Sequence, residues 1–137
     1  YDNNRLTIIN DSKSTSLASS ENLLKNLTNV YWILCGIPKK GDKFNPTKSQ
    51  CKNLKGYVIG NYHQQFSKIL KNKFILKKFK NLRQTLNKIF LEIKYNKEEK
   101  NTILFSPAGA SFDNFKNFED RGFYFNQTIK KYLNAKR

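Results

Sequence analysis

The stretch VYWILCGIPKKGD at residues 30–42 decides the fold. Its first six residues are apolar or aromatic without interruption, which is typical of a strand buried on both faces of a parallel sheet. A Gly-Ile-Pro sequence follows and predicts a tight loop, which carries Lys39 and Lys40. A buried strand that ends in such a loop is the repeating unit of α/β sheets, so the stretch predicts this fold class if similar units flank it.

Similar units do flank it, because apolar runs of strand length alternate along the chain with segments of helical period. This alternation predicts a single Rossmann-like α/β domain with a mostly parallel open sheet of about six strands and helices on both faces. The expected strands cover residues 6–10, 30–35, 56–60, 74–79 and 102–105, and the expected helices cover residues 16–27, 46–54, 62–70, 82–93 and a last stretch from Phe112 or Asn114 toward Leu133, broken or bent at Gly122.

The length of 137 residues and the hydrophobic fraction of 38% suit one domain with its own core. No apolar run approaches the roughly 18 residues of a membrane span, so we expect a cytoplasmic monomer without membrane insertion. Cys35 and Cys51 are expected to be reduced and structural, and His63 is the single histidine, so no zinc site can be assembled. Because the sequence lacks Met and opens on polar residues, we expect a fragment of a longer protein.

The formal net charge of +16 suggests a polyanionic partner, because Lys and Arg neutralise phosphates. The 26 basic residues, however, comprise 22 Lys and only 4 Arg, alongside 18 Asn and 4 Ala. An AT-rich genome produces this pattern by filling solvent-exposed positions with Lys and Asn, whereas base reading favours the bidentate Arg. We therefore expect a solvated lysine surface and no specific nucleic acid, and the alternative is a basic α/β nucleic-acid-binding module.

Two loops that follow expected strands carry possible anion ligands. Residues 10–15, NDSKST, place Lys13 and several hydroxyl groups just before a helix N-terminus, where free backbone N–H groups favour a carboxylate or phosphate. The competing interpretation is a helix-capping loop with a solvated lysine. Lys39 and Lys40 in the second loop suit the same chemistry, although two lysines in a turn are more often simply solvated.

A third loop lies within LFSPAGASFDNFKNFEDRG, residues 104–122. Its small residues at 108–111 let the backbone approach a ligand closely, and the Ser111 hydroxyl can donate a hydrogen bond to a carboxylate. The phenylalanines at 112, 115 and 118 have the spacing of a helical core face, so packing is the favoured interpretation of Phe112 and Phe115.

The sequence excludes several self-contained enzyme types. It contains no GxxxxGK[ST] phosphate loop and no GxGxxG, HExxH or GxSxG motif, and it offers one histidine as a general base. If the protein acts on an activated substrate, another domain must therefore hold the ATP.

Taken together, the three loops resemble the C-terminal domain of the Mur ligases, and among them the members that add D-glutamate. The segments NDSKST (10–15), CGIPKKGDKF (35–44) and SPAGASFDNFKNFEDRG (106–122) carry the resemblance, which runs in order over nearly the whole chain. Cys35 stands where the family usually has Gly, and Gly109 replaces a frequent Cys. The second loop is one residue longer than in many members, so Lys40 could take the place of Lys39. The nearer alternative is the C-terminal domain of a folate-polyglutamating ligase, and SFDNFKNFEDRG argues against it.

The resemblance implies a three-domain, ATP- and Mg²⁺-dependent amide ligase of peptidoglycan precursor synthesis. Residues 1–137 would be its C-terminal glutamate-ligase domain, inactive alone, and the UDP-binding and ATP-binding domains are absent from the chain. Such ligases phosphorylate the carboxylate of UDP-N-acetylmuramoyl-L-alanine with ATP, and the amine of D-glutamate attacks the acyl phosphate. When the domains close and exclude water, Asp11 would face the ribose and Lys13 the phosphate or glutamate side.

The resemblance also implies a set of D-glutamate ligands, with no catalytic residue and no metal ligand assigned in this domain. Lys39 and Thr15 would hold one carboxylate of D-glutamate. Ser111 and the backbone N–H of Phe118 would hold the other. Two anionic groups on one small zwitterion explain why an ammonium, hydroxyls and a backbone donor should converge.

Overall fold

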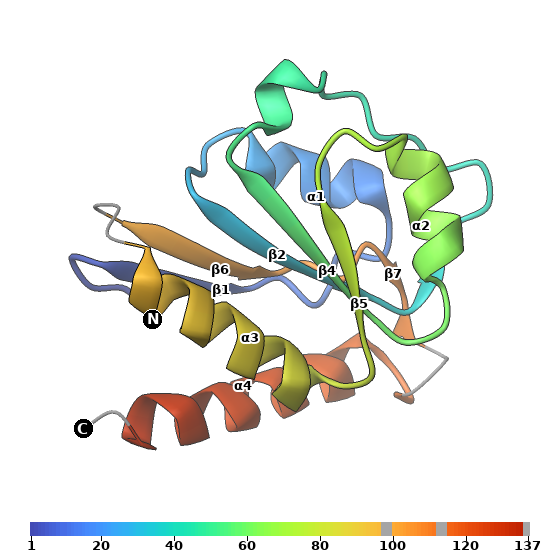
Figure 1. Ribbon diagram of the computed structural model, residues 1–137. Coiled ribbons are helices and arrows are strands. Elements are labelled where there is room, and N and C mark those ends of the chain that lie inside the picture. Colours follow the sequence, from blue (N-terminus) through green and yellow to red (C-terminus); the bar gives the residue numbers. More distant parts are fainter. Residues whose placement is uncertain (97–99, 112–114, 136–137) are drawn as a thin grey trace.

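The computed structural model describes residues 1–96, 100–111 and 115–135. Its centre is a sheet of five parallel strands, with the bounds Leu6–Asn10 (β1), Val30–Cys35 (β2), Leu54–Ile59 (β4), Leu76–Phe79 (β5) and Asn101–Phe105 (β6). The strands lie in the order β1-β6-β2-β4-β5, so β1 and β5 form the two edges (Figure 1). The predicted parallel open sheet is confirmed.

Two helices cover each face of this sheet (Figure 1). α1 (Leu17–Leu24) and α2 (His63–Leu70) lie on one face, and α3 (Leu82–Tyr95) and α4 (Phe118–Ala135) lie on the other. Side chains of β2 alternate between the two layers, since Trp32 packs with α1 and α2 whereas Ile33 packs with α3 and α4. The predicted Rossmann-like α/β domain with helices on both faces is therefore confirmed. In the described ranges, none of the helices has the apolar stretch that a membrane span requires.

Polar side chains fix where the two helices nearest the site loops begin. Ser16 Oγ accepts a hydrogen bond from the Ser19 N–H at 3.2 Å at the start of α1. Asn117 Oδ1 accepts one from the Asp120 N–H at 2.8 Å at the start of α4. Such caps satisfy donors that the first turn leaves without a partner. They hold the helices that follow β1 and β6 in place at the same end of the sheet.

A second, two-stranded sheet lies beyond the carboxyl ends of the large one. It pairs Ile37–Pro38 (β3) antiparallel with Gly109–Ala110 (β7). The sequence predicts neither strand, because two residues flanked by Gly and Pro have no period of their own. The pair joins the second and third predicted loops directly.

Two predicted helix boundaries are wrong on the α1 side of the sheet. The helix expected at residues 16–27 ends at Leu24, and the chain continues in a turn in which the Leu27 N–H donates to Leu24 O at 3.3 Å. Leu27 packs against the core from this turn, so its apolar character does not require a longer helix. The helix expected at residues 46–54 is a single 3-10 turn, Ser49–Cys51 (η1).

The last helix also differs from the prediction. It begins at Phe118, and the predicted starting points Phe112 and Asn114 lie outside the described residues. Phe118 is 39% exposed and does not belong to the buried side of α4. Gly122 does not break the helix. Instead it allows close packing, because a Cβ atom at Gly122 would lie 2.3 Å from Ser12 Oγ.

Candidate functional site

The three predicted loops meet at the carboxyl ends of neighbouring strands. β1, β6 and β2 are adjacent in the sheet, and the loops at residues 10–15, 106–111 and 36–42 follow them. The chain leaving β1 enters α1 on one face, whereas the chain leaving β6 enters α4 on the other (Figure 1). Adjacent parallel strands whose connections run to opposite faces open a crevice at their carboxyl ends, which is the usual ligand site of α/β sheets. The fold thus places all three loops where a ligand would bind.

Backbone hydrogen bonds tie these loops to one another. The Ala108 N–H donates to Ser14 O at 3.1 Å, which joins the third loop to the first. The Cys35 N–H donates to Pro107 O at 3.1 Å, which joins the end of β2 to the third loop. The β3–β7 ladder adds a second link between the second and third loops. The three loops therefore form one connected unit.

Asp11 is held within this unit. Its N–H donates to Phe105 O at 2.7 Å, and its carboxylate Oδ2 accepts from Ser14 Oγ at 2.5 Å and from Ser106 Oγ at 2.8 Å. The fully buried Ser106 hydroxyl also shares a hydrogen bond with Ser20 Oγ of α1 at 2.5 Å. This network fixes the end of β1 against β6 and α1.

The N-terminus of α1 contacts a carboxylate of the chain itself. Asp42 Oδ2 accepts a hydrogen bond from the Leu17 N–H at 2.6 Å, in a first turn that has no acidic residue of its own. The sequence predicts this helix end as an anion site, and Asp42, which sequence reasoning missed, takes part of that role. Because Asp42 belongs to the second loop, the bond also holds the segment that carries Lys39 beside the first loop.

Arg121 lies between the three loops and was also missed by sequence reasoning. Its side chain is fully buried, with Nη1 donating to Gly109 O and Nη2 donating to Ser12 O, both at 2.9 Å. The second loop passes beside it, because a Cβ atom at Gly36 would lie 2.9 Å from Nη1 and 2.3 Å from Ala110 O. The planar guanidinium thus donates hydrogen bonds to two loops, and in the third loop it leaves no room for a side chain at position 36. The available signal was composition, since Arg is rare in a chain that otherwise uses Lys.

The predicted side-chain ligands surround this unit. Lys13, Thr15 and Lys39 are exposed on the first and second loops, whereas Ser111 directly follows β7 and is only 4% exposed. Because β3 and β7 are antiparallel, Lys39 and Ser111 leave the small ladder at opposite ends. A single ligand that contacts both must therefore span the ladder.

The predicted backbone donor, the Phe118 N–H, lies at the start of α4. Phe118 is the first residue of the helix, and the N–H groups of a first turn have no partner within the helix. Phe115 is half-buried, and its ring centroid lies 5.5 Å from that of Tyr124, in line with the packing interpretation. Phe112 lies outside the described residues. The Phe118 ring is exposed, so a functional role of this residue would rest on its amide.

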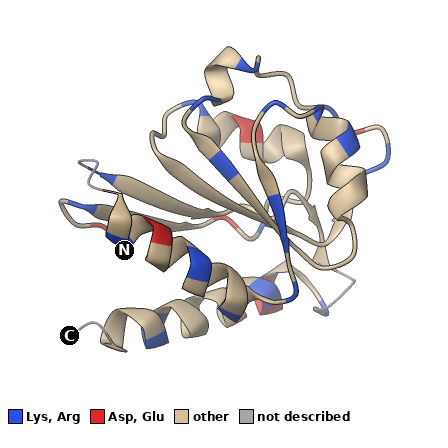
Figure 2. Ribbon diagram, viewed as in Figure 1, with Lys and Arg blue, Asp and Glu red and all other residues tan. Residues whose placement is uncertain are grey.

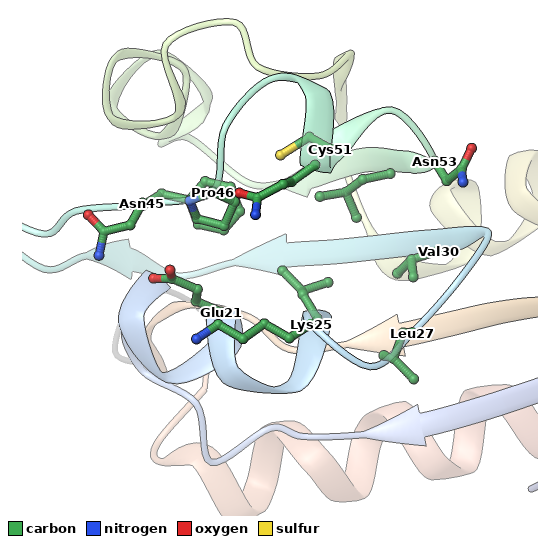
Figure 3. A pocket seen from close by; sticks show the side chains of 12 residues that line it. Glu21, Lys25, Leu27, Val30, Asn45, Pro46, Cys51 and Asn53 are labelled. Atoms are coloured by element: carbon green, nitrogen blue, oxygen red, sulfur yellow. The ribbon is translucent and has the colours of Figure 1, made fainter.

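Other features of the chain lie apart from this site. The described residues contain no group of three or more His, Cys, Asp or Glu side chains that could hold a metal. Cys35 and Cys51 are both buried, and no disulfide joins them. A cavity of about 470 Å³ lies between α1 and the η1 segment, with Glu21 of α1 and the following Lys25 on one side and Asn45, Pro46 and Cys51 on the other (Figure 3). None of the predicted ligands lines this cavity.

No protein-family model matches the chain. It is nevertheless similar to several proteins named UDP-N-acetylmuramoylalanine–D-glutamate ligase. It is 40% identical to that of Wolbachia pipientis wMel over 114 residues, which is 83% of this chain and 22% of the relative. For Petrotoga mobilis the identity is 38% over 133 residues, 93% of this chain and 29% of the relative. For Rickettsia felis it is 34% over 131 residues, 94% of this chain and 29% of the relative. The chain thus spans about a quarter of the length of these relatives.

The similarity and the structure agree. The aligned regions cover most of this chain, and the fold is the parallel α/β domain that the resemblance implies, with its three motif loops joined at one edge of the sheet. The chain belongs to the Mur ligase family, and its similarity is consistent with the C-terminal portion of a UDP-N-acetylmuramoylalanine–D-glutamate ligase.

Proposed function

We propose that this chain is the D-glutamate-binding part of a ligase that joins D-glutamate to UDP-N-acetylmuramoyl-L-alanine in peptidoglycan precursor synthesis. The observation that carries the proposal is the convergence of three loops, which bear Thr15, Lys39 and Ser111, at the β1-β6-β2 edge. The names of the relatives supply the two substrates. A small molecule with two carboxylates suits a surface of ammonium, hydroxyl and backbone N–H donors.

Each carboxylate of D-glutamate would have its own ligands. Lys39 and Thr15 would hold one carboxylate, and Ser111 with the Phe118 N–H would hold the other. Lys39 and Ser111 leave the β3–β7 ladder at opposite ends, which suits two separate carboxylates better than one anion. Lys40 follows Lys39 directly and is also exposed, so it is the alternative ligand.

The reaction would proceed in two steps. The carboxylate of UDP-N-acetylmuramoyl-L-alanine would take the terminal phosphoryl group of ATP, giving an acyl phosphate and ADP. The amine of D-glutamate would then attack the acyl carbon, and a tetrahedral intermediate would expel inorganic phosphate as the amine loses its proton. This chain would contribute orientation, because two held carboxylates fix the position of the attacking amine.

ATP, Mg²⁺ and the UDP group would be bound mainly by UDP-binding and ATP-binding domains outside this chain. The sequence contains no phosphate loop, and the described residues offer no cluster of metal ligands. Asp11 and Lys13 would face the nucleotide when the domains close in the cytoplasmic enzyme. Since the Asp11 carboxylate already accepts from two serines, it would act mainly by fixing the loop, whereas the exposed Lys13 would supply positive charge.

D-glutamate-dependent release of ADP by the complete polypeptide tests these roles. Lys39→Ala removes a charge-assisted hydrogen bond of about 2 kcal/mol, so the KM for D-glutamate should rise about 30-fold while the KM for ATP stays unchanged. Ser111→Ala should raise the same KM by about tenfold. Lys43→Ala is the matched control, because Lys43 is an exposed lysine just beyond the same loop, and its variant should stay within about twofold of wild type.

If Lys39→Ala and Ser111→Ala both leave the KM and kcat for D-glutamate at wild-type values, the assigned site is wrong. If Lys40→Ala raises the KM for D-glutamate about 30-fold and Lys39→Ala does not, Lys40 is the ligand in place of Lys39, and the other assignments stand.

A further inference from the structure

The lysines of this protein are concentrated on one side of the molecule. Residues 44–79, which follow the second site loop, contain 8 of the 22 lysines and no acid, so they carry +8 of the net charge of +16. This segment includes η1, β4, α2 and β5, and Figure 2 shows basic residues gathered over these elements. A genome that favours Lys raises the lysine content of the whole chain but does not separate acids from lysines. Codon bias therefore does not explain the segregation.

Part of this charge is engaged within the protein. Lys55 and Lys77 form ion pairs with Glu92, with N–O distances of 3.6 and 3.5 Å, and Lys73 Nζ donates to Phe44 O at 2.6 Å. The five other lysines of residues 44–79 are exposed, and no acidic side chain in the described ranges forms an ion pair with them. Together with Ile75 they define a surface that we name the lysine edge: Lys48, Lys52, Lys68, Lys71, Ile75 and Lys78.

The lysine edge also includes an exposed apolar residue. Ile75 is 69% exposed, whereas Phe74 and Leu76 on either side of it pack into the core beneath α2. Ile75 lies just before β5, which is an edge strand of the sheet. Lysines alone would protect such an edge against pairing with another chain, so this protection does not explain the exposed Ile75. A basic surface that also exposes an apolar side chain is typical of a contact with a membrane surface.

We propose that the lysine edge binds the surface of membranes that contain anionic phospholipids. Lysine ammonium groups act as point charges and suit a diffuse layer of lipid phosphates, whereas nucleic-acid recognition favours the forked Arg. The lysine edge contains no Arg. Ile75 inserts among the headgroups, and the chain stays on the surface of the bilayer.

The position of the lysine edge is compatible with an open candidate site. η1 and the turn before β5 lie at the amino ends of β4 and β5, whereas the three site loops follow the carboxyl ends of β1, β2 and β6 (Figure 1). Binding at one end of the sheet leaves the other end accessible to substrates. The membrane contact is therefore independent of the D-glutamate site, and each can fail its test without the other.

Co-sedimentation of this chain with vesicles tests the contact, using phosphatidylcholine alone and phosphatidylcholine mixed with phosphatidylglycerol. Binding is expected only to the mixed vesicles and should be lost at high salt, because exposed charges are screened. Each lysine near an anionic surface contributes roughly fivefold in affinity, so Lys71→Glu with Lys78→Glu should weaken binding by about twentyfold or more. Lys130→Glu with Lys131→Glu is the control of equal net charge, on exposed positions of α4, and should stay within about threefold of wild type.

Two further measurements separate a membrane from other polyanions. Ile75→Ser should weaken vesicle binding without changing its salt dependence, since it removes apolar insertion and no charge. Single-stranded RNA should be released at lower salt than the vesicles. The inference is overturned if the α4 control loses as much affinity for the vesicles as the lysine-edge variant, or if Ile75→Ser binds the vesicles like wild type. It is also overturned if the protein stays bound to RNA at salt concentrations that release it from the vesicles.

Discussion

Arg121 determines the arrangement of loops that carry the proposed ligands, although no ligand role is assigned to Arg121 itself. Its guanidinium donates to the backbone oxygens of Ser12 and Gly109 and lies close to Gly36, so loops from three strands close around one side chain. A fully buried charge is costly to dehydrate and persists only where its hydrogen bonds compensate. Arg121 is therefore expected to be a positioning residue, whose loss would affect the loops before any chemistry.

Replacing Arg121 by Met should lower the free energy of unfolding by about 3 kcal/mol, because the buried Gly109 O and the partly buried Ser12 O lose their donors. Arg121→Lys should recover only part of the lost unfolding free energy, since an ammonium group cannot reproduce the two donors that the planar guanidinium directs at two separate backbone oxygens. Urea unfolding followed by circular dichroism measures the change. Arg83→Met, at an exposed position of α3, is the matched control and should stay within about 0.5 kcal/mol of wild type. Equal losses in the two Met variants would contradict the central role of Arg121.

Among the elements, the β3–β7 ladder depends on a close approach to the end of β2. A Cβ atom at Gly109 would lie 2.8 Å from Cys35 O and 3.0 Å from Gly36 C. The Mur ligase pattern usually has Gly at position 35 and often Cys at position 109, and this chain has the reverse at both positions. These atoms belong to the backbone, so a side chain at position 109 requires that backbone to move, and we interpret Gly at position 35 as the residue that permits the movement.

The exchange predicts coupling between the two substitutions. Gly109→Cys alone should destabilise the chain by about 2 kcal/mol, because the backbone at the end of β2 must move. Cys35→Gly alone should cost about 1–2 kcal/mol through the lost buried side chain. The loss of unfolding free energy in the double variant should be smaller, by at least about 1 kcal/mol, than the sum of the losses in the two single variants. Urea unfolding under reducing conditions measures all three variants, and strictly additive losses would show that the exchange is coincidental.

The elements of the large sheet could be predicted from sequence far better than those around the site. Continuous apolar runs, such as residues 30–35 and 102–105, match β2 and β6 to within a residue, because burial on both faces requires apolar side chains at every position. β3 and β7 have no such signal and exist only because their loops meet. Likewise, nothing local distinguishes Arg121 from a surface residue of α4, or shows that Asp42 contacts the start of α1. Turn residues located the loops, but tertiary contacts determine how the loops fit together.

At the scale of the whole molecule, the two proposed functions occupy opposite ends of one sheet. The carboxyl ends of β1, β6 and β2 carry the candidate amino-acid site, whereas the lysine edge lies toward the amino ends of β4 and β5, with Lys78 within β5. The chain spans about a quarter of the length of its relatives and contains no phosphate loop. The proposed division of labour therefore assigns the amino acid to this chain and phosphoryl transfer to the remainder of the enzyme.

This division predicts how the chain behaves alone and when it is grafted. Given ATP, Mg²⁺, UDP-N-acetylmuramoyl-L-alanine and D-glutamate, the chain alone should release no ADP above background, because it lacks the groups that bind the nucleotide phosphates. Grafted in place of the matching quarter of one of its relatives, it should support ADP release that depends on D-glutamate and not on L-glutamate. Lys131→Ala in the graft, at an exposed position of α4, is the control and should leave turnover unchanged. Turnover by the chain alone would contradict the assignment of phosphoryl transfer to the other domains. A folded graft that prefers L-glutamate would contradict the assigned amino acid. Ligands that hold both carboxylates in fixed positions place the α-amine of L-glutamate and that of D-glutamate differently, so they should favour one enantiomer.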